Sequence, residues 1–207
     1  MAIKKGHEIP TIDVVLVTIQ PSGGSDEIGL DTASKIEVSP QIETNDAIKL
    51  IVKGRLIAQK PVQNILTGNT ITLTDNVFNP EQVKIFQGGT IKYWGEEDHQ
   101  TKVDTDAGFG IASYTPPISS SGLKGAPFTL KAYSAIYDSA GLITGYERIS
   151  YPNCQGVPIS LSAEDDVFRV SEYTINSAPK ETEPPYVIDY LGSDGLPTVT
   201  PLPTHGG

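Results

Sequence analysis

The apolar positions along most of the chain recur at every second residue, which is the spacing of β-strands rather than of helices. The segment 11–20 is rich in β-branched residues and apolar on both faces, so we expect a strand that is covered on both sides. The segment 69–75 alternates threonine with isoleucine and leucine, which predicts a strand with one buried face. The run 47–58 is also predicted as a strand. A helix is the competing interpretation, but Gly54 and the β-branched residues favour the strand.

A β-hairpin is predicted in the C-terminal half. Its strands are 128–137 and 142–151, its turn is 138–141, and aromatic residues suited to cross-strand pairing mark its ends. Further strands are expected at 90–94, 157–162, 167–177 and 186–191. The chain is therefore expected to be mainly β.

One short helix is predicted at about 79–88. An asparagine can cap its first amides, a proline suits the first helical position, and a glutamine three residues after the cap completes a capping box. Two successive glycines supply a left-handed stop. The residues that carry this prediction are Asn79, Pro80, Gln82, Gly88 and Gly89.

Two long segments, 21–45 and 95–125, lose the strand periodicity and are rich in glycine, serine and proline, so both are predicted as long loops. Within the first, residues 35–38 alone hint at a strand. Residues 192–207 contain few residues that could pack, and we expect them to be an extended or disordered tail. The predicted organisation is a single β domain over 1–191 followed by this tail.

Composition narrows the function classes. With 207 residues the chain fits one domain, and 25 acidic against 15 basic residues give a net charge of -10. That charge disfavours binding to nucleic acid or to anionic lipid. The single cysteine cannot form an internal disulfide, and no apolar block has the length of a signal peptide or a membrane span.

A search for chemistry finds no catalytic, metal-binding or cofactor-binding constellation. The three histidines lack metal-ligand spacing, and nucleotide-binding and nucleophile-elbow motifs are absent from the sequence. Acidic residues at 96–106 and at 164–166 could in principle hold a hard cation, although a solvated loop and a turn are the favoured interpretations. Cys154 lies in a predicted turn with no evident histidine to activate it. We therefore expect a non-enzymatic protein without cofactor or metal, which acts through its surfaces.

Three stretches, in their order along the chain, resemble bacteriophage tail tube proteins, also called major tail proteins. They are 68–81 running into the helix and its glycines, 128–149, and 151–186. Together they cover about half of the chain, whereas the two long loops match nothing in that family. The residues that carry the resemblance outside the helix cap are Asp75, Asn76, Phe78, Tyr137, Asp138, Tyr146, Glu147, Tyr173 and Ile175.

The resemblance implies a two-sheet β-sandwich or partial barrel with one short flanking helix, long loops and extended termini. It also implies a structural virion protein whose copies form hexameric rings that stack into a hollow tail tube. Partners would be further copies and other tail proteins, DNA would pass through the lumen without specific binding, and no membrane would be involved. Such a protein is made in the cytoplasm of the bacterial host and resides in the virion tail.

Two rival functions remain open. The first is a carbohydrate-binding or receptor-binding β-sandwich on a virion or cell surface, in which Tyr114, Trp94 and the acidic loop would form a sugar platform with a bound cation. Calcium-dependent thermal stabilisation would favour it. The second is an enzyme, which would need histidines and carboxylates converging in a cleft.

Overall fold

The computed structural model describes residues 9–24, 27–30, 32–44, 49–53, 55–60, 64–94, 102–103, 110–118, 125–159, 165 and 170–199. The helix is α1 (Pro80–Gln87). The strands are β1 (Thr11–Pro21), β2 (Ile28–Leu30), β3 (Ala33–Thr44), β4 (Lys49–Val52), β5 (Arg55–Gln59), β6 (Asn64–Asp75), β7 (Thr90–Trp94), β8 (Lys102–Val103), β9 (Ile111–Thr115), β10 (Phe128–Tyr137), β11 (Ile143–Gly156), β12 (Ser171–Ser177) and β13 (Val187–Gly192).

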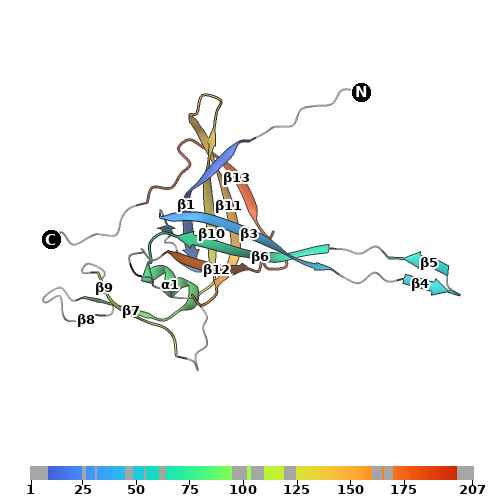
Figure 1. Ribbon diagram of the computed structural model, residues 1–207, viewed down its shortest axis with the longest axis horizontal. Helices are drawn as coiled ribbons and strands as arrows, with labels where there is room; N and C mark the ends of the chain where they lie inside the picture. Colours follow the sequence, from blue (N-terminus) through green and yellow to red (C-terminus); the bar gives the residue numbers. More distant parts are fainter. Residues whose placement is uncertain are drawn as a thin grey trace.

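One large antiparallel sheet dominates the fold, in the order β2-β1-β10-β11-β12-β6-β3, with β13 paired to β11. Strand β11 pairs with β13 over residues 145–150 and with β12 over residues 154–156. The sheet therefore divides at β11 into two layers, and Figure 1 shows β3, β6 and β12 crossing the direction of β1, β11 and β13. The predicted mainly-β class with one short helix is confirmed, and the sheet does not close into a barrel.

The hydrophobic core lies between these layers and under α1. Val17 and Ile19 of β1, Leu130 of β10 and Ile71 and Leu73 of β6 are almost completely buried in it. Residues 16–19 of β1 are all buried, so the expectation that this strand is covered on both faces is confirmed there, whereas residues 11–13 are exposed. The predicted 128–151 hairpin is present as β10 and β11.

The start of α1 follows the capping signals in the sequence. Oδ1 of Asn79 accepts a hydrogen bond from the backbone N–H of Glu81 at 2.9 Å, and Pro80 occupies the first turn. Gln82, in contrast, does not complete a capping box, because its Nε2 donates to Oδ2 of Asp75 at 3.1 Å. The buried carboxylate draws the glutamine away from the end of the helix.

Replacing Gly88 by valine should lower the free energy of unfolding by about 1–3 kcal/mol, since Gly88 has φ 82° and ψ -161°, a region open essentially to glycine. Gly88 N–H also donates to the carbonyl of Lys84 at 2.9 Å, so the strain falls on the bond that ends the helix. Urea denaturation of the purified variant measures the change. A midpoint equal to that of the parent chain would contradict this assignment of the cap.

The prediction of two long loops is wrong for much of their described length. Strands β2 and β3 lie inside 21–45, and β8 and β9 lie inside 95–125, where they pair with β7. Strand β3 pairs with β6 from Ala33 to Thr44. Its outer half is exposed on both faces, which leaves no buried stripe for the sequence pattern to reveal.

Three strand boundaries also differ from those predicted. The run 47–58 forms two paired strands, β4 and β5, and the split follows Lys53, whose φ is 46°. Gly54 itself lies outside the described residues. The predicted turn around Cys154 is instead part of β11, with an irregularity at Asn153, whose φ is 48°. Residues 157–159 are not a strand, and 160–162 lie outside the described residues.

The described part of the predicted tail lies against the body of the protein. A Cβ added at Gly29 of β2 would lie 2.7 Å from Cγ2 of Val199, so the two residues are in direct contact. The segment after β13 therefore reaches across to β2, which lies at the opposite end of that layer. Residues 200–207 lie outside the described residues.

Candidate assembly surfaces

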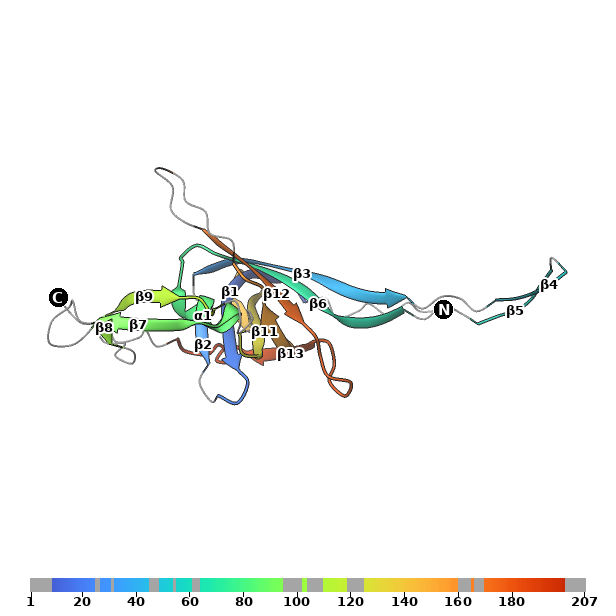
Figure 2. The same cartoon turned by 90° about the horizontal axis from the view of Figure 1, so that it is seen from below.

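A long arm projects from the body of the protein. Its base is the antiparallel ladder between β3 and β6, which continues out to the pair Thr44 and Asn64. Strands β4 and β5 lie beyond the end of that ladder, and Figure 2 shows them far from the two layers of the large sheet. We call β4 and β5 with Lys60 the tip of the arm.

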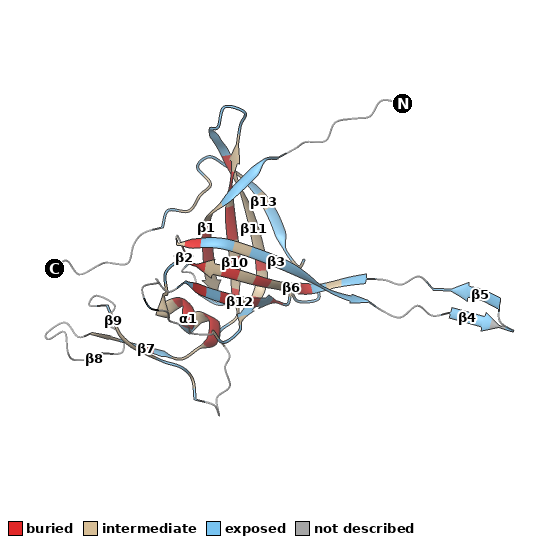
Figure 3. Cartoon of the chain, in the orientation of Figure 1, coloured by how far each residue is buried: buried red, intermediate tan, exposed pale blue. Residues whose placement is uncertain are grey.

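Apolar side chains on the tip are exposed to solvent (Figure 3). The exposed fractions of Leu50, Ile51, Leu56 and Ile57 are 54%, 60%, 55% and 59%. Burying a fully exposed side chain of this kind stabilises by about 1.5–3 kcal/mol, and somewhat more than half of that exposure remains to be buried here. A cluster of this size on a projecting hairpin indicates a surface that binds another macromolecule.

Three strands at the margins of the large sheet, β2, β3 and β13, have one partner each among the described residues, and two of them lie near each other. Strand β13 pairs with β11, and β3 pairs with β6. Val187, Ile188 and Tyr190 of β13 are exposed at 41%, 42% and 56%. Free edges with exposed apolar side chains can pair with a strand of another chain.

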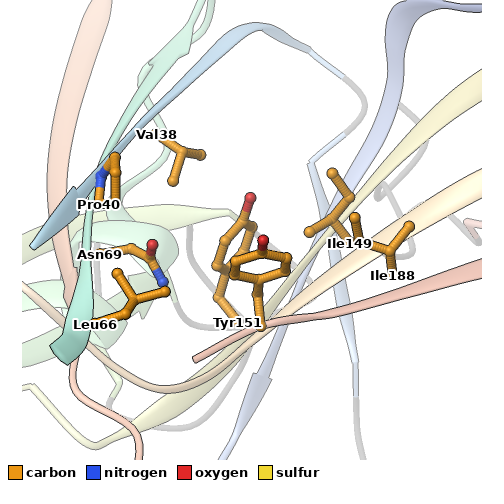
Figure 4. A pocket seen from close by; sticks show the side chains of 8 residues that line it. Val38, Pro40, Leu66, Asn69, Ile149, Tyr151 and Ile188 are labelled. Atoms are coloured by element: carbon orange, nitrogen blue, oxygen red, sulfur yellow. The ribbon is translucent and has the colours of Figure 1, made fainter. Parts of the chain in front are cut away.

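An open apolar cleft of about 320 Å³ separates the two layers on the side of these edges. Figure 4 shows its two walls facing each other, with Tyr151 between them. One wall comes from β3 and β6 and consists of Val38, Pro40, Leu66 and Asn69. The other comes from β11, β13 and the residue before β13, and consists of Ile149, Tyr151, Tyr186 and Ile188.

A hydrogen bond joins the two walls of the cleft. Nδ2 of buried Asn69 donates to the carbonyl of Pro185 at 3.0 Å. Burial, with Tyr186, Cys154 and Glu147 nearby, raises the pKa of Tyr151 to about 12, so its hydroxyl stays neutral at physiological pH. Asn69 and the tyrosine hydroxyls supply polar groups within otherwise apolar walls, so the cleft suits apolar side chains better than a charged ligand.

Comparison with known proteins identifies no family for this chain. No protein-family model matches the sequence, and no curated protein matches it either. The solved structures that are weakly similar include two from the anti-feeding prophage. The first is the tube-terminating cap of the anti-feeding prophage, with 13% identity, a TM-score of 0.36, and coverage of 91% of this chain and 95% of that one.

The second is the baseplate of the anti-feeding prophage, solved with sixfold symmetry applied. Its identity is 9% and its TM-score 0.32, over 94% of this chain and 99% of the matched chain. Similarity at this level does not establish a shared fold. The function of the chain is therefore argued from its own surfaces.

Several residues of the tail-tube resemblance gather at one corner of the core. Carboxylate oxygens of buried Asp75 accept hydrogen bonds from Oγ1 of Thr32, the backbone N–H of Val77 and Nε2 of Gln82. Tyr173 and Ile175 are buried on the neighbouring strand β12, and Phe78 packs against the same core. These residues, with exposed Asn76 beside them, hold the helix on the sheet and form no open site.

The remaining resemblance residues lie apart from that corner, on the β10–β11 hairpin. Oδ1 of Asp138 accepts from the backbone N–H groups of Ala140 and Leu142 and so shapes the turn. Tyr137 and Tyr146 are half-buried near that turn. Glu147 hydrogen-bonds Tyr190 across to β13, on the face of β11 that also carries the cleft residues Ile149 and Tyr151.

Most of the rival sugar platform lies outside the described residues. The hydroxyl of Tyr114 donates to the carbonyl of Gly88 at 2.7 Å and accepts from Nε2 of Gln87 at 2.8 Å, which ties it to the end of α1. Trp94 is half-buried in β7. The acidic residues 96–98, 104 and 106, all three histidines, and Glu164 and Asp166 lie outside the described residues.

The structure bears on two further kinds of site, a metal site and a reactive cysteine. Within the described ranges no three histidine, cysteine, aspartate or glutamate side chains gather as metal ligands. Cys154 is fully buried, and burial raises the pKa of its thiol to about 12, so the thiolate is absent at neutral pH.

In the part of the chain that the structure describes, no helix has the length and apolar character needed to span a membrane.

Sequence reasoning missed both the tip and the cleft. The sequence signal for the tip is an apolar run that is interrupted by Lys49, Lys53 and Arg55 and has apolar residues on both of its faces. Such a run fits neither a half-buried strand nor a solvated loop. The cleft has no signal of its own, because its walls come from segments that are at least 80 residues apart in the sequence.

Proposed function

We propose that this chain is a structural virion protein, the subunit of a hollow phage-type tail tube. Copies assemble into hexameric rings, the rings stack, and genome DNA passes through the central channel. Further copies of the chain and other tail proteins are its partners. The protein is made in the cytoplasm of the bacterial host and ends up in the virion tail.

The observation that carries this proposal is the arm. A projecting hairpin whose large apolar residues are more than half exposed would be a liability in a protein that works as a monomer. The exposed edge strand β13 presents the same liability. Assembly into a polymer of identical subunits would bury both features.

The charge of the chain suits a conduit. A net charge of -10 gives the average surface a potential that repels phosphate groups. A lumen of that sign would let a nucleic acid slide instead of adhering. The chain thus has apolar surfaces that favour association with its own copies and a net charge that disfavours binding of the DNA.

The proposal is tested by electron microscopy and sedimentation of the purified full chain over a range of concentrations. We expect rings or tubes whose averaged end views show sixfold symmetry. The variant Ile42→Asp, which places a charge at an exposed apolar position on the arm, should raise the concentration needed for assembly at least tenfold. Ser139→Asp, on the exposed β10–β11 turn, is the matched control.

Monomers at every concentration would contradict the proposed function. So would closed dimers, because a tube requires a contact that repeats from copy to copy. Equal effects of Ile42→Asp and Ser139→Asp would show that added charge acts through overall repulsion and not through the arm.

A further inference from the structure

We infer that the tip of one copy docks in the cleft between the two layers of a second copy. This inference rests on the proposed function in one respect only, namely that the chain associates with itself. The inference adds the identity of the two surfaces that form the contact. The tip supplies exposed Leu50, Ile51, Leu56 and Ile57, and the cleft supplies two largely apolar walls.

The two surfaces match in chemical character. Val38, Ile188 and Tyr186 at the cleft are exposed at 38%, 42% and 42%, so this cleft is an unfilled extension of the core. Ile51 and Leu56 are directly paired across β4 and β5 and form one apolar ridge. A ridge of two branched side chains is the kind of group that apolar walls exclude from water.

The tip lies away from the cleft of its own chain. The β3–β6 ladder continues from Val38 and Pro40, which line the cleft, out to the pair Thr44 and Asn64. Figure 2 shows the tip beyond the far end of this ladder. With the arm extended in this way, the occupant of the cleft comes from another molecule.

Charge complementarity selects a second copy as that molecule. Lys49, Lys53, Arg55 and Lys60 make residues 49–60 a segment with four positive charges and no acidic residue. The rest of the chain then holds 11 basic against 25 acidic residues, a net charge of -14. Glu147 lies on the same face of β11 as the cleft residues Ile149 and Tyr151, so a carboxylate lies near the cleft. Attraction between the tip and another body therefore opposes the repulsion between bodies.

The contact has a defined symmetry. Tip and cleft are different surfaces, so each copy can give one tip and receive another. Two copies that exchange tips form a closed dimer, whereas a tip passed on from copy to copy is a heterologous contact that generates a ring or a stack. The proposed tube needs the second arrangement.

Disulfide cross-linking between two single-substitution chains tests the contact. Leu56→Cys on the tip and Ile188→Cys in the cleft are prepared with tags of different mass, mixed and mildly oxidised. We expect a mixed dimer on non-reducing gels, at least tenfold more abundant than with Ser139→Cys in place of Ile188→Cys. Cys154 is fully buried and stays silent. Equal cross-linking of Ile188→Cys and Ser139→Cys would overturn the inference.

A second variant pair keeps the test independent of thiol chemistry. Leu56→Asp should weaken self-association at least tenfold, whereas Thr67→Asp, at an exposed position on the base of the arm, should change it less than threefold. Thermal unfolding of each variant verifies that the fold is intact. Binding of the wild-type chain to anionic lipid vesicles, lost in Leu56→Asp without any change in self-association, would assign the tip to membranes and overturn the inference.

Failure of this inference is separable from failure of the proposed function. Rings or tubes without the tip–cleft cross-link would leave the tube and refute the contact. Cross-linked chains that form open, irregular polymers would keep the contact and refute the tube. A chain that stays monomeric and gives no cross-link would refute both.

Discussion

Replacing Phe86 by alanine should lower the free energy of unfolding by about 3–5 kcal/mol, the cost typical of removing a fully buried aromatic ring. Its ring centroid lies 5.5 Å from that of Phe128 on β10 and 4.8 Å from that of Tyr173 on β12. The ring thus joins α1 to both layers of the sheet. Removing the ring leaves a cavity where α1, β10 and β12 meet.

The surroundings of Phe86 prevent the cavity from collapsing. A Cβ added at Gly156 of β11 would lie 2.6 Å from Cα of Phe86, so helix and strand are already in backbone contact. The helix therefore cannot move inward, and the cost should lie at the upper end of the range. Urea denaturation followed by circular dichroism measures it. Lys84→Ala, on the exposed face of the same helix, should change stability by less than about 0.5 kcal/mol.

A loss below 1 kcal/mol for Phe86→Ala would contradict the packing of α1 against both layers. The result bears on assembly as well. Strands β11 and β3 carry the two walls of the cleft, and they belong to different layers. Loosening the corner under α1 should therefore also weaken association, but with a loss of stability that tip variants do not show.

The sequence was informative where local chemistry and burial act together. The capping asparagine, the proline after it and the glycines after the last turn predict α1 because these residues satisfy or terminate backbone hydrogen bonds locally. The β10–β11 hairpin was predictable because strand and turn residues alternate cleanly there. At β10 the inward positions Phe128 and Leu130 are fully buried, so the pattern reports a real interface.

The arm was less predictable because its structure is not encoded by burial within one chain. Strand β3 beyond Ile36 is exposed on both faces and contains Pro40, so its residues look like a loop. It is a strand because β6 offers a continuous ladder of backbone partners. The exposed apolar residues of the tip make sense only when a second molecule is considered, and no pattern in one sequence specifies where that molecule binds.

Irregularities in the strands were also hidden. Asp13, Lys53 and Asn153 have positive φ, although none of them is a glycine. Asp13 falls where the register between β1 and β10 shifts, and Asn153 where the register between β10 and β11 shifts, just before β11 meets β12. Aspartate and asparagine tolerate this conformation better than most residues, but they are also common in turns, which is how residues 152–156 were interpreted.

Replacing Asp75 by alanine should lower the free energy of unfolding by about 3 kcal/mol, because three donors lose their acceptor at a fully buried position. Oδ1 accepts from Oγ1 of Thr32 at 2.5 Å and from the backbone N–H of Val77 at 3.1 Å, and Oδ2 accepts from Nε2 of Gln82 at 3.1 Å. These donors belong to the segment before β3, the segment after β6, and α1. Asp75 therefore connects the base of the arm to the helix through hydrogen bonds. Chemical denaturation of the variant measures how much these bonds contribute to the free energy of unfolding.

The asparagine variant separates hydrogen bonding from charge. Asp75→Asn keeps an oxygen for Thr32 and Val77 and places an amide N–H₂ opposite Gln82. Oε1 of Gln82 is buried without a hydrogen-bond partner, so a half-turn of the glutamine amide brings that oxygen to the new donor. We therefore expect Asp75→Asn to cost only about 1 kcal/mol. If it costs as much as alanine, the negative charge of Asp75 and not its capacity to accept hydrogen bonds holds this corner, and the role assigned to Gln82 is wrong.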